Sequence, residues 1–188
     1  MRYILPLAAL ALAGCSKAET PPVTVHEVML NTVDKHADQL WDMTNAAIGD
    51  EGGIDPAKMD DKRWDEIARL AGEVEGGARQ LAALEHPRAV KPGVKIADED
   101  VPYGDSGASV QANLDKNPEL FREYASTLAA HMHDMAQAAR KHDAAAVGPM
   151  VDQLDQVCES CHLDYWYPSQ KELVEKYARG PVTEPTKS

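Results

Sequence analysis

The chain has few aromatic residues and no run that is typical of a β-strand. Only 5% of its 188 residues are aromatic, and Phe121 is the single phenylalanine. No segment shows the strict alternation of polar and apolar residues that marks a half-buried strand. Alanine and leucine must therefore supply most of the core, and this composition favours helices. The sequence predicts an all-α protein.

Positive charge is also scarce. The chain has 19 Lys and Arg residues against 31 Asp and Glu residues, which gives a formal net charge of −12 at pH 7. Such an acidic chain is unsuited to the phosphates of nucleic acids and to anionic lipid headgroups. We therefore expect no nucleic-acid partner, and the acidity is compatible with a basic partner protein.

The chain lacks an apolar run at its start that is long enough to span a membrane as a helix. Residues 4–13 are almost wholly apolar, follow the positive charge of Arg2, and are interrupted only by Pro6. A basic start followed by a short apolar run is typical of a signal peptide. We therefore expect residues 1–14 to direct export and to be absent from the folded domain.

Only three cysteines are present, and the first lies at the end of this leader. Residues 12–15 read Leu-Ala-Gly-Cys, and small residues before a cysteine resemble a bacterial lipoprotein processing site. Cleavage there leaves Cys15 as the lipidated first residue, with residues 15–22 as a tether on the periplasmic side of a bacterial membrane. The alternative is ordinary secretory cleavage near Ala18, which discards Cys15 and releases a soluble periplasmic protein.

The other two cysteines belong to the most informative motif of the chain. Cys158, Cys161 and His162 form a C-x-x-C-H run, the attachment signature of a c-type haem. Two thiols one helical turn apart can bond to the two vinyl groups of one porphyrin, and the adjacent histidine can bind the iron as the proximal ligand. A redox dithiol or half of a zinc site uses the same cysteine spacing. The chain has no second cysteine pair and no βαβ pattern around this motif, and both absences make the redox dithiol and the zinc site less favoured. The motif therefore predicts one haem c per chain.

Apolar residues recur every three or four positions in four long segments, as in amphipathic helices. We expect these helices over residues 23–48, 61–85, 118–142 and 143–166. Asn117 and Asp143 are the expected caps of the third and fourth helices. Gly148 and Pro149 are expected to kink the fourth helix or to delay its start. The haem motif continues the apolar stripe of this last helix, so a porphyrin attached there would be buried among the other three.

The rest of the chain is expected to form connections and a tail. Residues 87–117 make a long connection, in which Ser109 is the expected cap of a short helix. Residues 23–168 then form one haem-binding domain, and residues 169–188 form a charged tail that begins with a short helix.

Four amphipathic helices with C-x-x-C-H near the end of the last resemble the cytochrome c′ group, the class II cytochromes c. Ordinary cytochromes c carry this motif near the N-terminus instead. Residues 157–168, Val-Cys-Glu-Ser-Cys-His-Leu-Asp-Tyr-Trp-Tyr-Pro, are also similar to a lipoprotein-like branch of the group. The resemblance covers residues 23–168 and implies an antiparallel four-helix bundle with a covalent haem near one end. The long connection and the tail depart from the compact members.

The resemblance also bears on the second axial position of the iron. In this group the first helix covers that position early in its length, with an apolar residue in five-coordinate members and methionine in six-coordinate electron carriers. Met29 stands at the matching position and is the candidate distal ligand. Two alternatives are that Met29 only fills core space and that His26, one turn earlier, binds the iron instead.

These observations favour an exported one-electron carrier that meets a redox partner protein. The alternative is a haem protein with a vacant or exchangeable sixth position, which binds nitric oxide or carbon monoxide. We expect no enzymatic activity, because a peroxidase-like reaction needs a distal acid–base pair and the first helix offers only His26 and His36 as bases. Relatives often pair through their helices, so a homodimer is a further expectation.

Overall fold

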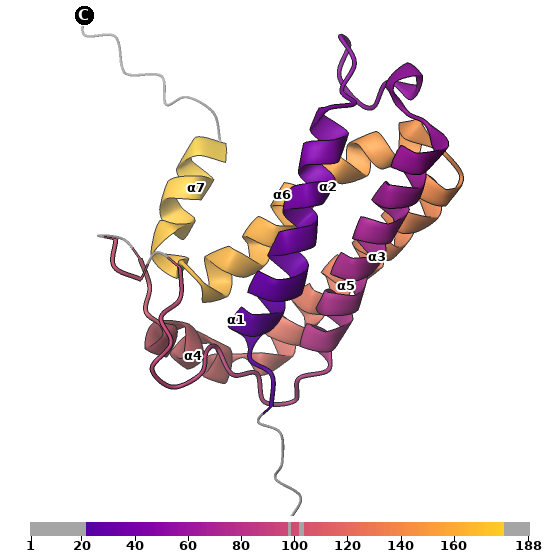
Figure 1. Ribbon diagram of the computed structural model, residues 1–188. Helices are drawn as coiled ribbons and strands as arrows, with labels where there is room; N and C mark the ends of the chain where they lie inside the picture. Colours follow the sequence, from indigo (N-terminus) through magenta and orange to yellow (C-terminus); the bar gives the residue numbers. More distant parts are fainter. Residues whose placement is uncertain (1–21, 98, 102–103, 179–188) are drawn as a thin grey trace, which may run out of the picture.

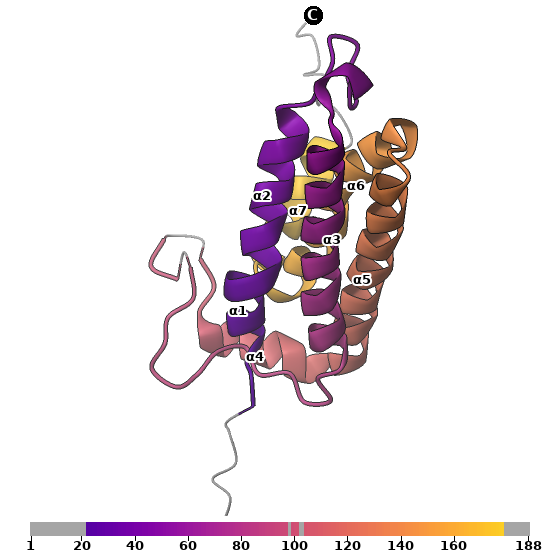
Figure 2. The same ribbon diagram turned by 45° about the vertical axis from the view of Figure 1, so that its right-hand side comes forward.

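The computed structural model describes residues 22–97, 99–101 and 104–178 of the chain (Figures 1 and 2). Regular structure in these residues is helical, and the only strand-like pairing among them joins Ile48 to Ile54. The all-α prediction is therefore confirmed for this part of the chain. In chain order the helices are α1 (Val25–Val28), the π-helix η1 (Met29–Val33), α2 (Asp34–Asn45), the 3-10 helix η2 (Pro56–Lys58), α3 (Asp61–Ala82), α4 (Gly107–Lys116), α5 (Pro118–Arg140), α6 (Ala144–Tyr165), the 3-10 helix η3 (Pro168–Gln170) and α7 (Lys171–Ala178).

Four long helical segments lie side by side and alternate in direction (Figures 1 and 2). α1, η1 and α2 run on from one another as the first segment, and α3, α5 and α6 are the others. α3 packs against both α2 and α5, and α6 packs against α5. α4 lies across the end of these segments at which α1 begins.

Side chains cap the long helices where the sequence predicts them. Asn117 accepts a hydrogen bond from the backbone N–H three residues later at 3.2 Å, and Asp143 does the same at 3.0 Å. α1 begins with a capping box, in which the side chains of Thr24 and Glu27 each bond to the backbone N–H of the other. These caps satisfy N–H groups that have no partner inside the helix.

The first segment ends earlier than predicted. α2 ends at Asn45, and Ile48, the last residue of the expected first helix, is 45% exposed. Ile48 instead pairs with Ile54 across a turn in which Gly52 and Gly53 adopt φ angles of +84° and +69°. Glycine adopts such angles without a steric penalty, so this turn replaces the last helical turn that periodicity predicts.

The structure also differs from two expectations about helix starts, while the alternative that Gly148 and Pro149 kink the fourth helix stays a prediction. Ser109 does not cap the short helix, because Ser106 accepts a hydrogen bond from the Ser109 N–H at 3.1 Å and α4 begins earlier. Pro149 does not delay the start of α6, which begins directly after its Asp143 cap. Pro149 lies in the second turn, where its missing N–H removes a single hydrogen bond near the helix end.

The core lies mainly along the faces that α3 and α5 share with their neighbours. Large side chains with less than 2% exposure include Leu40, Ile67, Met132, Met135 and Leu154. One face of α3 is buried from Trp64 to Leu81, and α3 ends three residues earlier than expected, at Ala82. No described helix is both long and apolar enough to cross a lipid bilayer.

Candidate functional site

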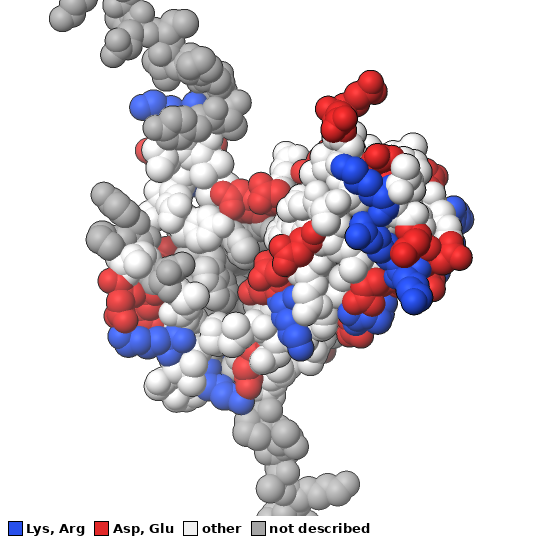
Figure 3. Space-filling model, turned by 45° about the horizontal axis from the view of Figure 1, so that its top comes forward, with Lys and Arg blue, Asp and Glu red and all other residues white. Residues whose placement is uncertain are grey.

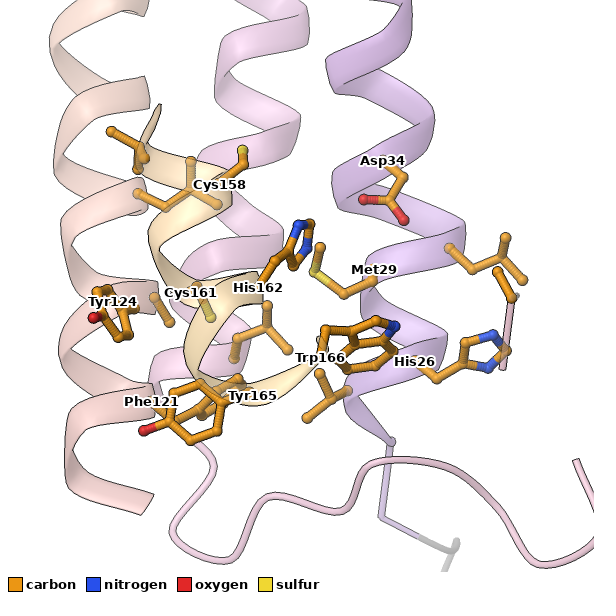
Figure 4. A pocket seen from close by; sticks show the side chains of 17 residues that line it. His26, Met29, Asp34, Phe121, Tyr124, Cys158, Cys161, His162, Tyr165 and Trp166 are labelled. Atoms are coloured by element: carbon orange, nitrogen blue, oxygen red, sulfur yellow. The ribbon is translucent and has the colours of Figure 1, made fainter. Parts of the chain in front are cut away.

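A largely apolar pocket lies between α6, α5 and the first helical segment (Figure 4). It contains about 990 Å³ of empty space, part of it open to solvent. Pockets that bind cofactors are typically lined by apolar side chains with a few polar groups that fix the orientation of the ligand. Apolar side chains from three segments form much of its wall, among them Leu81, Phe121, Ala125, Leu128 and Val157.

α6 places all three residues of the C-x-x-C-H motif on this wall. Cys158, Cys161 and His162 line the pocket, and each is half-buried. Burial raises the pKa of both thiols to about 12, and carboxylates near Cys158 add to its shift. Thiols with such a high pKa are protonated at neutral pH, whereas a reactive redox dithiol needs a lowered thiol pKa. The site therefore does not favour the redox-dithiol alternative.

The zinc alternative also lacks support. A structural zinc site uses four ligands drawn mainly from cysteine and histidine. Within the part of the chain that the structure describes, no three His, Cys, Asp or Glu residues lie close enough together to hold a metal ion. The two thiols and one imidazole thus suit covalent attachment of a porphyrin, with its iron held by a single protein imidazole on this side.

The surroundings of His162 favour the neutral form of its imidazole. Burial lowers the pKa of His162, although nearby carboxylates partly oppose the shift. The imidazole is therefore uncharged at neutral pH, and this is the form that binds metals. Its Nδ1 atom lies 3.2 Å from the Tyr167 hydroxyl oxygen. Nε2 is therefore the ring nitrogen that does not contact this hydroxyl.

The first helical segment forms the opposite wall. Met29 and His26 both line the pocket. Figure 4 shows the Met29 thioether directed toward the His162 ring, whereas His26 extends away from that ring. His36 does not line the pocket, and its Nδ1 lies 2.7 Å from the Thr32 carbonyl oxygen. The structure therefore places Met29 near the haem motif. It places neither His26 nor His36 with its side chain directed toward His162.

The π-helix explains which side chains this wall presents. A π-helix forms i→i+5 hydrogen bonds, so residues five apart lie close to the same face. Met29 and Asp34 are five apart and both line the pocket, while Val28 and Val33 are five apart and both face the core. Sequence reasoning missed Asp34 because a 3.6-residue period places it away from Met29. Burial raises the pKa of the Asp34 carboxyl, with His162 opposing the shift.

A pocket of this kind, with the C-x-x-C-H residues on its wall, is typical of a c-type haem protein. Residues 96–166 match the family model described as Cytochrome C′, and α4, α5 and α6 with the whole motif lie within the match. This part of the chain is therefore similar to the cytochrome c′ family, and that similarity points to a covalently bound haem c. No curated protein and no solved structure matches the chain.

The match confirms the predicted relationship with cytochrome c′ for this segment only. Similarity to a lipoprotein-like branch stays a prediction. Met29 and the first two long segments lie outside the match. Cys15 and residues 1–14 lie outside the described part of the chain, so their expected roles are also still predictions.

The residues present fit a haem. The pocket offers two thiols, one neutral imidazole and an apolar interior, and these are the groups that a covalently attached porphyrin needs. Sequence analysis identified the two thiols, His162 and Met29. It missed Tyr167, whose only sequence signal is its place before Pro168, where a helix cannot continue unchanged.

Proposed function

We propose that this protein is an exported one-electron carrier with a single haem c. The observation that carries the proposal is the position of Met29, which faces His162 across the pocket from the first helical segment (Figure 4). Cys158 and Cys161 would form the two thioether bonds, His162 would be the proximal ligand and Met29 the distal ligand. When bound, the haem supplies an iron centre that gains and loses one electron.

The protein's part in this function is to hold the iron in one environment in both oxidation states. His162 and Met29 come from different segments that pack on the same core, so their separation is set by the fold. The apolar walls lower the local dielectric around the haem, and a methionine ligand raises the reduction potential. If His162 and Met29 both hold the iron, the fold keeps them in place in both oxidation states, which would permit fast electron exchange with little rearrangement.

The fold we propose is the antiparallel four-helix bundle of the cytochrome c′ group, formed by residues 23–168. The alternating directions of the four long segments support this proposal (Figures 1 and 2). We further propose that residues 1–14 are a signal peptide and that Cys15 carries a lipid, which would anchor the domain on the periplasmic side of a bacterial membrane. Ordinary cleavage near Ala18 would give a soluble periplasmic form.

A basic redox partner suits the charge around the pocket. Asp34, Asp155 and Glu159 all lie close enough to raise the pKa of Cys158. On the face drawn in Figure 3, acidic side chains lie around the hollow in the middle of the surface. Negative potential beside an electron-transfer site steers cationic partners toward it. A homodimer stays a separate prediction.

Optical spectra of the purified holoprotein test the proposed function. We expect low-spin c-type spectra in the oxidised and reduced states, and Met29→Ala should convert both to high-spin spectra. Met43→Ala is the matched control, because Met43 lies on α2 but not on the pocket wall. A high-spin spectrum of the unaltered protein, or a low-spin spectrum that survives in Met29→Ala, would overturn the proposed ligation.

The alternative function is binding of nitric oxide or carbon monoxide. The specific observation in its favour is that the pocket is partly open to solvent, so a small ligand can reach it. The rate of carbon monoxide binding to the reduced protein separates the two functions. A rate proportional to carbon monoxide concentration indicates an accessible iron, whereas a rate that saturates indicates that Met29 must leave first.

A further inference from the structure

Two hydrogen bonds connect the Nδ1 side of the His162 ring to a carboxylate through the hydroxyl of Tyr167. The Tyr167 hydroxyl donates to Glu159 Oε2 at 2.7 Å, and the same hydroxyl oxygen lies 3.2 Å from His162 Nδ1. The rings of His162 and Tyr167 have centroids 5.5 Å apart and an interplanar angle of 53°. All three side chains are half-buried.

The end of α6 builds this arrangement from nearby residues. Glu159 lies three residues before His162, so the two share a face of the helix. The His162 carbonyl oxygen accepts from both the Trp166 N–H at 2.8 Å and the Tyr167 N–H at 2.9 Å, which turns the chain back at the helix end. Pro168 follows and keeps Tyr167 out of the helical conformation, with φ −143° and ψ 61°. This turn places the Tyr167 ring next to His162, with its hydroxyl oxygen near Nδ1.

The direction of each hydrogen bond follows from the chemistry of the groups. An ionised carboxylate only accepts, so the Tyr167 hydroxyl must donate its proton to Glu159. The lone pairs of the hydroxyl oxygen are then available to His162, and Nδ1 must carry the hydrogen that it donates. The neutral ring has one hydrogen only, so Nε2 presents its lone pair.

We propose that Tyr167 and Glu159 are positioning residues that make His162 a stronger ligand for the haem iron. The hydroxyl and the carboxylate fix the ring orientation and the tautomer, and they draw the Nδ1 hydrogen toward negative charge. A histidine whose second nitrogen donates toward a carboxylate is a more basic ligand. A more basic proximal ligand stabilises the oxidised iron and so lowers the reduction potential. This inference rests on the proposed attachment of haem through this motif.

The chain contains a matched control for this pair. The Tyr124 hydroxyl donates to Asp164 Oδ2 at 2.6 Å, so a second tyrosine–carboxylate pair also involves α6. Tyr124 lines the pocket, but the bonds found in the structure do not connect its hydroxyl to His162. Tyr124→Phe therefore removes a part-buried hydroxyl bond of the same kind and leaves the bonds among Tyr167, Glu159 and His162 in place.

The experiment compares Tyr167→Phe, Glu159→Gln and Tyr124→Phe holoproteins from a host that attaches haem c. Resonance Raman spectra of the reduced proteins, recorded in a Met29→Ala background to leave the iron five-coordinate, report the iron–histidine stretching frequency. We expect Tyr167→Phe to lower this frequency, Glu159→Gln to lower it less, and Tyr124→Phe to change it less than either. In the Met29 proteins, Tyr167→Phe should raise the reduction potential by up to about 59 mV, which is a tenfold change in the oxidised-to-reduced ratio for one electron.

Each outcome decides the inference. If Tyr167→Phe keeps the stretching frequency, or shifts it only as much as Tyr124→Phe does, the inference is wrong although haem is attached. If Tyr167→Phe fails to fold, Glu159→Gln alone decides by the same two readouts, because its side chain has nearly the same shape. If the unaltered chain carries no covalent haem, the proposed function fails and the inference fails with it.

Discussion

Val33 of η1 packs directly on Gly77 of α3. A Cβ atom built on Gly77 would lie 2.9 Å from Val33 Cγ2 and 3.0 Å from Thr32 Cγ2, which is closer than carbon atoms approach without displacement. The absence of a side chain on Gly77 therefore permits the π-helical turn to lie against α3. That turn carries Met29 at its first position and leads to Asp34, so this contact helps set one wall of the pocket.

Gly77→Ala should destabilise the protein and disturb the wall that holds Met29. Overpacking costs about 1–3 kcal/mol, and the better helix propensity of alanine returns about 1 kcal/mol. We expect a net loss of about 1 kcal/mol in the free energy of unfolding, measured by urea denaturation, together with partial loss of the low-spin spectrum. Gly76→Ala is the control, because no atom lies within 4 Å of the added Cβ and the protein should be stabilised. Equal effects of the two substitutions would contradict this account.

Thr24→Ala should weaken the start of the first helical segment, in which α1 carries His26 and η1 carries Met29. Thr24 is buried and forms both halves of a capping box with Glu27. Loss of such a cap typically costs about 1 kcal/mol. Thermal unfolding followed by circular dichroism measures the loss. Thr127→Ala is the control, since Thr127 is exposed and bonds only to a carbonyl of its own helix, at 2.9 Å. A loss no larger than that of the control would show that the capping box contributes little.

Lys91→Gln should reduce stability in a pH-dependent way. Lys91 forms a hydrogen-bonded ion pair with Glu27, and this bond holds the pKa of Glu27 below its ordinary value of 4.5. The folded state thus has the lower pKa, so the pair stabilises the fold above pH 4.5 and loses this contribution as the pH falls through the folded pKa. Urea unfolding at several pH values should show Lys91→Gln less stable at pH 7 and equal to the unaltered protein in acid. Lys95→Gln, from a more exposed pair with Asp100, should be neutral throughout.

Electron transfer should depend on the charge of the reaction partner. Asp155 lies close enough to Cys158 and His162 to shift the pKa of both. Reduction by the hexaammineruthenium(II) cation should slow as salt is added, because salt screens the attraction. Asp155→Asn should slow it at low salt, whereas Asp61→Asn, at the first residue of α3, should leave it unchanged. Stopped-flow absorbance at several ionic strengths gives these rates, and a rate that rises with salt would contradict an acidic docking site.

The fold was largely predictable from local signals. Helical periodicity and the side-chain caps depend on residues three or four apart, so Asn117 and Asp143 mark helix starts in both sequence and structure. The exposed position of Ile48 was not predictable, because the glycine turn after α2 overrides the periodicity. The cap of α4 was also not predictable, because both Ser106 and Ser109 are residues that commonly cap helices and the sequence does not choose between them.

The site was predictable where a fixed spacing defines it. Cys158, Cys161 and His162 are adjacent in sequence and need only one helix to bring them together. Asp34 was missed because it faces the pocket only through a π-helical turn, and such turns leave no periodic signal. Tyr167 was missed because its contact with Glu159 depends on how the chain turns after α6.

The most direct test of the central claim is the mass and colour of the intact, denatured chain purified from a bacterial host that matures c-type cytochromes. The account predicts a haem absorption spectrum that stays with the denatured chain and a mass increased by one haem. It further predicts that Cys158→Ser combined with Cys161→Ser abolishes both. A colourless chain with the mass of the unmodified polypeptide, with or without lipid, would contradict the account.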